Sequence, residues 1–164
     1  MEHKNNEQQR FDAVWARVTA THETFLPDCA VIQPEEPLSA LIAAEAANGA
    51  YYAAVAGSLR HCDTAAFFRS LPNGCGKRLS TLQTLYFLLN GDSCPHKTTP
   101  AVPPKSPLMA LREAYWRETH AAGALKNAAQ QSDSAKLAQP LLELAEQSRQ
   151  RSSKILQRIQ RAMA

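Results

Sequence analysis

The sequence predicts an all-α protein, and three observations favour that fold class. Apolar residues recur at helical spacing along most of the chain, no segment alternates apolar and polar residues over a useful length, and proline and glycine gather in a few short stretches. Of the 164 residues, 45% are hydrophobic and 20% are charged, which is ordinary for one globular domain with a sizeable core. We therefore expect helices packed around that core.

The first predicted element is a helix over residues 7 to 20. One face of it carries an i, i+3, i+4, i+7 stripe that must pack against other residues: Phe11, Val14, Trp15 and Val18. The stretch LPDCAVIQPEEP that follows is punctuated by proline and predicts an irregular connector. We expect residues 1 to 36 to form this helix and connector, which dock on a four-helix bundle made by residues 37 to 164.

Two long helices are predicted next. The Ala-rich stretch PLSALIAAEAANGAYYAAVAGSLRH holds no breaker except two glycines, and it predicts a helix that ends near His61. A second helical stretch begins with DTAAFFRSL and runs to Gly91, which stands where a C-terminal cap belongs. Its first half contains Pro72, so we expect an interruption or a bend there. Tyr52 and Tyr86 are expected to fill core volume.

A proline-rich stretch separates these two helices from the last two. Residues 91 to 107 contain five prolines and predict a linker, which can reach roughly 50 Å when extended. Apolar residues at helical spacing resume over residues 108 to 130 and again over 135 to 162, with QQSDS as the turn between them. Pro140 falls within the first turns of the last helix, where proline is tolerated.

Composition argues against several classes of protein. The N-terminus MEHKNNEQQRF lacks the apolar region of a secretory signal, and the apolar stretches end well before the length that predicts a membrane span, so we expect a cytoplasmic protein. The four cysteines contain no C-x-x-C pair, which argues against a zinc ribbon and a disulfide framework. A net charge of +3 is too small to predict a nucleic-acid partner by itself.

An internal repeat relates the two halves of the predicted bundle. The interval in the sequence from Glu45 to Glu118 equals the interval from Arg78 to Arg151. Several apolar positions around them keep this offset as well. A shared interval for an acidic and a basic residue within apolar stripes indicates a duplicated helical hairpin.

The matched polar residues interrupt the apolar faces of the predicted helices. They comprise Glu45, Cys75, Arg78, Glu118, Ser148 and Arg151. Two inward-facing arginines need anionic partners, because an unpaired buried charge costs several kcal/mol. The two matched glutamates are the candidates, since each interrupts an Ala-rich helix face. We therefore expect ion pairs inside the bundle.

This arrangement resembles the ferritin-like superfamily, specifically its rubrerythrin-like diiron four-helix bundles. In that family, single glutamates on the first and third helices and a Glu-x-x-His turn on each of the other two helices hold two irons. By this resemblance EAANGAYY and ETHAAGAL correspond to the single-Glu helices, so Glu45 and Glu118 match metal ligands. The resemblance covers residues 38 to 160 and implies that the Pro-rich linker is the crossover between two hairpins.

The other four ligand positions depart from the family pattern. CGKR puts Cys75 in place of the Glu and Arg78 in place of the His, and SRQR likewise puts Ser148 and Arg151 there. The resemblance thus implies a pseudo-diiron site in which Arg–Glu salt bridges replace iron. No metal or other cofactor is expected, and any metal that does bind would have only the two matched glutamates as ligands.

The leading interpretation is a catalytically silent bundle with a structural or interaction role, through an unknown protein partner or through self-association. The first alternative is an active diiron oxidoreductase or peroxidase, with iron as its cofactor. Such an enzyme would need unmatched ligands, for which the candidates are Glu113, His120, Glu143 and Glu146.

Two further alternatives remain open. Nucleic acid or an acidic partner could bind the basic residues of the last helix, which are Arg149, Lys154, Arg158 and Arg161. Cys75 could be a redox thiol activated by the neighbouring arginine, although a buried inert cysteine is the commoner outcome.

Overall fold

The computed structural model of this protein describes residues 38–60, 62–104 and 106–163, and all regular secondary structure in these ranges is α-helical. This confirms the predicted all-α class. The helices are α2 (Leu38–Ser58), α3 (Cys62–Asn90), α4 (Pro107–Gln130) and α5 (Ala135–Met163). The predicted N-terminal helix and connector, residues 1 to 36, lie outside the described residues. No helix in the described part of the chain is long and apolar enough to cross a membrane.

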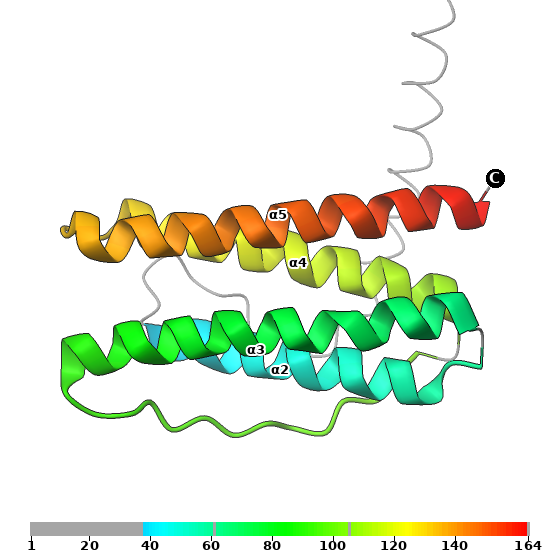
Figure 1. Cartoon of the computed structure of the whole chain (residues 1–164), viewed down its shortest axis with the longest axis horizontal. Helices are drawn as coiled ribbons and strands as arrows, with labels where there is room; N and C mark the ends of the chain where they lie inside the picture. The colour runs from blue at the N-terminus through cyan, green and yellow to red at the C-terminus, as the bar shows by residue number, and fades with distance from the viewer. Residues whose placement is uncertain (1–37, 61, 105, 164) are drawn as a thin grey trace, which may run out of the picture. The chain divides into compact units, whose positions relative to one another are not determined.

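The four helices form two antiparallel hairpins (Figure 1). Helices α2 and α3 make the first hairpin, α4 and α5 make the second, and the two helices of each hairpin pack along each other. The linker, described for residues 91–104, runs back alongside the first hairpin, so α4 starts near the end where α3 starts and points the same way (Figure 1). The helix directions are therefore up, down, down and up. Contacts between the hairpins join α2 to α4 and α3 to α5.

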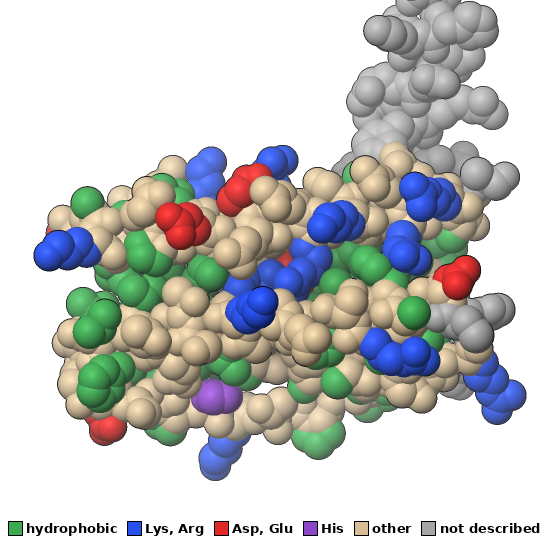
Figure 2. Space-filling model, in the orientation of Figure 1, with side chains coloured by type: hydrophobic (Ala, Val, Ile, Leu, Met, Phe, Trp, Pro, Cys, Tyr) green, Lys and Arg blue, Asp and Glu red, His purple; other side chains and the backbone are tan. Residues whose placement is uncertain are grey.

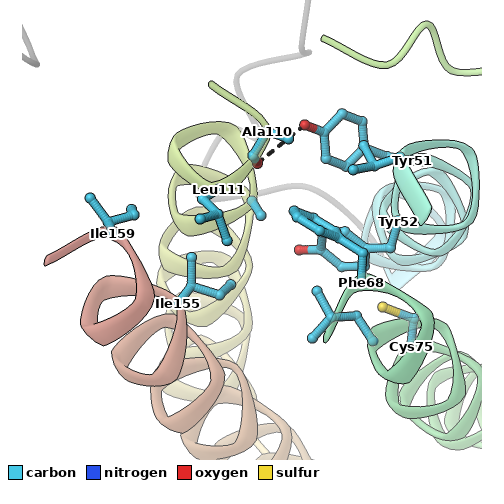
Figure 3. Close-up of a cluster of buried hydrophobic side chains, with 11 residues drawn as sticks. Tyr51, Tyr52, Phe68, Cys75, Ala110, Leu111, Ile155 and Ile159 are labelled. Carbon is cyan, nitrogen blue, oxygen red and sulfur yellow. Dashed lines mark hydrogen bonds between the residues drawn. The ribbon is translucent and has the colours of Figure 1, made fainter. Parts of the chain in front are cut away.

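Two clusters of buried apolar side chains fill the bundle. We call one the aromatic cluster because it contains Tyr51, Tyr52 and Phe68, which face residues of α4 and α5 such as Leu111 (Figure 3). The other is the leucine cluster, and its members are Leu41, Ile42, Leu82, Leu85, Cys94, Leu125, Ala129, Leu141, Leu144 and Ala145. Along each of the four helices, the residues of one cluster end before those of the other begin. A separate level of the bundle therefore lies between the two clusters.

Helix α3 is one uninterrupted α-helix, so of the two predicted outcomes at Pro72 the interruption is wrong, while the bend stays a prediction. A proline in a helix interior removes a backbone donor and costs about 3 kcal/mol. However, Phe68 and Leu71 before the proline and Cys75 after it are all buried in the aromatic cluster. Their burial offsets this cost, because apolar area removed from water contributes about 25 cal/mol per Å².

The end of α3 and the start of the linker are both fixed by hydrogen bonds. Gly91 adopts a φ of 73°, and its N–H donates to the carbonyl oxygen of Phe87 at 2.8 Å, which confirms the predicted C-terminal cap. The Gln83 side chain of α3 donates to the carbonyl oxygen of Cys94 at 3.0 Å and accepts from the Cys94 N–H at 3.2 Å. Because the Cys94 side chain is also buried in the leucine cluster, the linker is anchored to the first hairpin.

Pro72→Ala should raise the free energy of unfolding by about 1 to 3 kcal/mol, because alanine restores a backbone donor in a helix that continues on both sides. Urea unfolding followed by circular dichroism measures the change. Pro100→Ala, in the linker, is the matched control and should leave stability unchanged or slightly lower, since there the proline only restricts the unfolded chain. A destabilised Pro72→Ala variant would mean that packing of the proline ring outweighs the missing hydrogen bond.

Candidate functional site

The level between the two apolar clusters is occupied by polar and charged side chains from all four helices. We call it the polar layer. Its members are Glu45 of α2, Arg78 of α3, Glu118 of α4, and Ser148 and Arg151 of α5. The side chain of Arg151 is 16% exposed and the other four are buried. Cys75, the remaining residue singled out in the sequence, is buried in the aromatic cluster and contacts both arginines of the layer.

Arg78 lies at the centre of the polar layer. Its Nη2 lies 2.6 Å from Oε1 of Glu45, and its Nε donates to the same oxygen at 2.9 Å. The same Nη2 lies 3.3 Å from Oε1 of Glu118. Glu45 belongs to the first hairpin and Glu118 to the second. One fully buried guanidinium therefore bridges carboxylates of both hairpins through charge-assisted hydrogen bonds.

Glu118 collects donors from three helices on one oxygen. Besides Arg78, its Oε1 accepts from Nη1 of Arg151 at 3.2 Å and from the hydroxyl of Tyr52 at 2.9 Å. Burial raises the pKa of Tyr52 well above its usual range, and the Glu118 carboxylate adds to the effect. Tyr52 is therefore a neutral donor near neutral pH. The sequence assigned it only to core volume, although its position seven residues after Glu45 puts both on one helix face.

Burial and ion pairing act in opposite directions on the central pair. Burial raises the pKa of the Glu45 carboxyl, and the Arg78 guanidinium beside it opposes that rise. For Arg78, burial acts to lower the pKa, but the carboxylates of Glu45 and Glu118 more than reverse this and hold it above its usual range. Arg78 is therefore a permanent cation, and removing it would leave burial of the carboxyl unopposed.

The buried Cys75 thiol lies next to two guanidinium groups. Arg78 Nη2 and Arg151 Nη1 donate to its Sγ at 3.6 and 3.4 Å. Burial nevertheless raises the pKa of the thiol far above its usual range, with the nearby Glu45 adding to the rise against the two arginines. A thiol that stays protonated near neutral pH is a weak nucleophile. The raised pKa therefore favours a buried, unreactive Cys75 over a redox-active thiol.

Gly74 makes room for Arg151, a role that sequence reasoning missed. A Cβ built at position 74 would overlap Nη2 of Arg151 and lie 2.8 Å from its Cζ. With no side chain there, the guanidinium lies against α3, and its Nη1 lies 3.5 Å from the carbonyl oxygen of Leu71. The ion pair between Arg151 and Glu118 therefore needs a residue without a side chain at position 74. The only signal in the sequence was a glycine in the interior of a helix.

The polar layer is not fully satisfied by hydrogen bonds. Among the described residues, three of its buried atoms have no hydrogen-bond partner within the protein, namely Nη1 of Arg78, Oε2 of Glu118 and Oγ of Ser148. Each such atom costs about 1 to 3 kcal/mol relative to a paired one. A buried ion-pair network often contributes less stability than an apolar core of the same volume.

The unmatched ligand candidates do not meet at the polar layer. Glu113 pairs with Arg117 at 2.8 Å. The exposed ring of His120 stacks on Trp116, with centroids 3.9 Å apart. Exposed Glu143 accepts from Gln139, and exposed Glu146 accepts from Arg149, whose hydrogen bond lowers the pKa of that carboxyl to about 2. Among the described residues, these four side chains therefore do not join Glu45 and Glu118 in a ligand set.

The residues of the polar layer do not fit a diiron centre. The Oε1 atoms of Glu45 and Glu118 already accept from guanidinium groups, and Arg78 and Arg151 are cations that cannot ligate iron. Within the described residues, no group of three or more His, Cys, Asp or Glu side chains could hold a metal ion. The chemistry of these side chains is therefore that of an internal ion-pair network.

Comparison of the chain with protein-family models, with curated proteins and with solved structures gave no match. Relatives therefore assign no family or activity, and the functional argument rests on the geometry described above.

Gly74→Ala should destabilise the protein by about 1 to 3 kcal/mol, because the new methyl group displaces Arg151 from Glu118 and leaves a buried carboxylate with less compensation. Gly76→Ala is the matched control on the same helix. A Cβ at position 76 meets nothing within 4 Å, so this change should stabilise the helix by about 0.5 to 1 kcal/mol. Thermal and urea unfolding measure both variants.

An Arg151→Ala background completes this test. Once the guanidinium is gone, Gly74→Ala should become stabilising, as Gly76→Ala is, because only the helix propensity of alanine remains. If Gly74→Ala stays destabilising without Arg151, the glycine serves some purpose other than making room for the guanidinium.

Arg78→Met should lower the free energy of unfolding by about 3 to 5 kcal/mol, because it strands the buried carboxylates of Glu45 and Glu118. Adding Glu45→Gln should recover part of the loss, which a double-mutant cycle measures. Additive effects of the two changes would show that the pair contributes nothing to stability.

The same variant should also respond to pH. Loss of Arg78 raises the pKa of Glu45 further above its usual 4.5, so the folded variant binds this proton more tightly than the unfolded chain does. Its stability should therefore rise as the pH falls through the folded-state pKa. Urea unfolding at about pH 7 and about pH 5 should show the difference from the parent shrinking. A constant difference would mean that Glu45 stays ionised.

Proposed function

We propose that this chain is a metal-free relative of the ferritin-like, specifically rubrerythrin-like, diiron bundles. In this proposal its Arg–Glu network replaces the metal centre, and its role is structural or interaction-based rather than catalytic. The observation that carries the proposal is the bridge made by Arg78, a buried cation between Glu45 and Glu118 from two hairpins. A metal ion in such a bundle would lie at the same level and would likewise be positively charged.

The order and direction of the helices support the proposal. Ferritin-like bundles differ from simple up-down-up-down bundles in having one long crossover connection between two hairpins. Here residues 91–106 form such a connection, and the helices run up, down, down and up (Figure 1). The equal intervals between the matched glutamates and between the matched arginines fit a duplicated hairpin.

The state of each functional group supports a role without catalysis. The glutamates are held by guanidinium groups, and the thiol of Cys75 stays protonated near neutral pH. We propose a protein partner or a second copy of the chain as the binding partner, and the cytoplasm as the compartment.

Restoring the ligands tests the proposal. The variant carries Cys75→Glu, Arg78→His, Ser148→Glu and Arg151→His, which together recreate two Glu-x-x-His turns. We expect the parent to purify without iron and the variant to bind up to two ferrous ions per chain, as measured by metal analysis. The clustered carboxylates should lower the stability of the metal-free variant, and ferrous iron should restore it by ligand linkage. Because α3 is continuous, no helix-regularising change is needed.

A matched control separates the effect of losing the arginines from the effect of gaining iron ligands. It carries Cys75→Gln, Arg78→Leu, Ser148→Gln and Arg151→Leu, so it removes the same arginines without supplying iron ligands. Circular dichroism checks that both variants fold. A parent that purifies with two irons contradicts the proposal, and so does a folded restored variant that takes up no more iron than this control.

A further inference from the structure

A group of cations lies on one side of the bundle, over the second half of α5 and the first half of α3. We call this surface the basic face, and its exposed or half-exposed members are Arg69, Lys77, Lys154, Arg158 and Arg161. Figure 2 shows Lys and Arg side chains gathered over this part of the visible surface. In the described part of α5 no acidic residue follows Glu146, and α3 contains one acidic residue, Asp63.

The charges of the basic face are not compensated locally. Within the described residues none of its five cations forms an ion pair, whereas nearby Arg149 pairs with Glu146 at 2.7 Å. Among the described residues outside this face, nine Lys and Arg stand against eight Asp and Glu, so that part of the chain is nearly neutral. The positive charge is thus concentrated on this side and is available to an anionic partner.

The cations follow the seam between α5 and α3. Lys154, Arg158 and Arg161 recur at i, i+4 and i+7, which puts them in one row about 10 Å long. The guanidinium of Arg158 lies over the ring of Phe67 on α3, 4.3 Å from its centroid, so the row runs where the two helices meet. Helix packing fixes Arg158, which lowers the entropy lost when it binds a ligand.

We infer that the basic face docks an acidic segment of a partner protein. A row about 10 Å long matches two turns of a helix that carries carboxylates at the same i, i+4, i+7 interval, and guanidinium groups bind carboxylates in bidentate geometry. Nucleic acid fits less well. In the described part of this face the aromatic ring at the seam, Phe67, is covered by Arg158 and offers no platform for stacking bases. This inference does not depend on the proposal that the chain is a metal-free relative of diiron bundles.

Binding of defined polyanions to the full chain tests this inference. Fluorescence anisotropy compares a labelled oligoglutamate peptide of about twelve residues with a single-stranded RNA of similar charge, at roughly 50 and 200 mM salt. The peptide should bind more tightly than the RNA and lose affinity as salt rises. The variant Lys154→Gln, Arg161→Gln should weaken peptide binding about three- to tenfold, the loss of two exposed ion pairs.

A matched control removes two cations elsewhere. Lys97 of the linker and Lys126 of α4 are exposed and lie outside the basic face, so Lys97→Gln, Lys126→Gln changes the net charge equally. This control should weaken peptide binding by less than about twofold. Equal losses of peptide affinity in the two variants would mean that only the net charge of the protein matters. That result would overturn the basic face as the binding site. Tighter binding of the single-stranded RNA than of the peptide would overturn the partner class.

Discussion

Arg78 holds carboxylates from both hairpins inside the bundle, and the alignment of the four helices depends on that contact. Each helix contributes at least one polar residue to a single level, with apolar clusters on either side. If one helix slid by a turn, about 5.4 Å, a charged side chain would enter an apolar cluster at a cost of several kcal/mol. Helix faces made only of leucine and alanine would give a smaller free-energy difference between the native alignment and one shifted by a turn. The polar layer thereby selects one alignment at some expense of stability.

Much of this arrangement follows from local patterns in the sequence. Apolar spacing is a property of each segment by itself, so it predicts the four described helices and, with Gly91, the end of α3. The interval shared by the two Glu and the two Arg positions is likewise visible without a structure, and it brings together Glu45 and Glu118 with Arg78 and Arg151. An unpaired buried charge is so costly that a polar residue inside an apolar stripe implies a partner of opposite charge.

The missed features depend on residues far apart in the chain. Pro72 favours an interruption locally, and only the burial of Phe68, Leu71 and Cys75 around it shows why the helix continues. Gly74 makes room for the guanidinium of Arg151, which belongs to the other hairpin. The hydroxyl of Tyr52 reaches Glu118 across the two hairpins, and no local pattern separates such a tyrosine from one that fills volume. Contacts between residues of different hairpins are set by tertiary packing, and the spacing of apolar residues along one helix does not reveal them.

The division of the core into two clusters has a consequence for how the sequence can change over time. Side chains such as Phe68 and Leu141 belong to different clusters, and the polar layer lies between those clusters. Substitutions at distant sites without shared partners act nearly additively. Each cluster can therefore exchange and repack its apolar residues without compensation in the other. The residues of the polar layer lack that freedom, since a change in any one of them alters the environment of the rest.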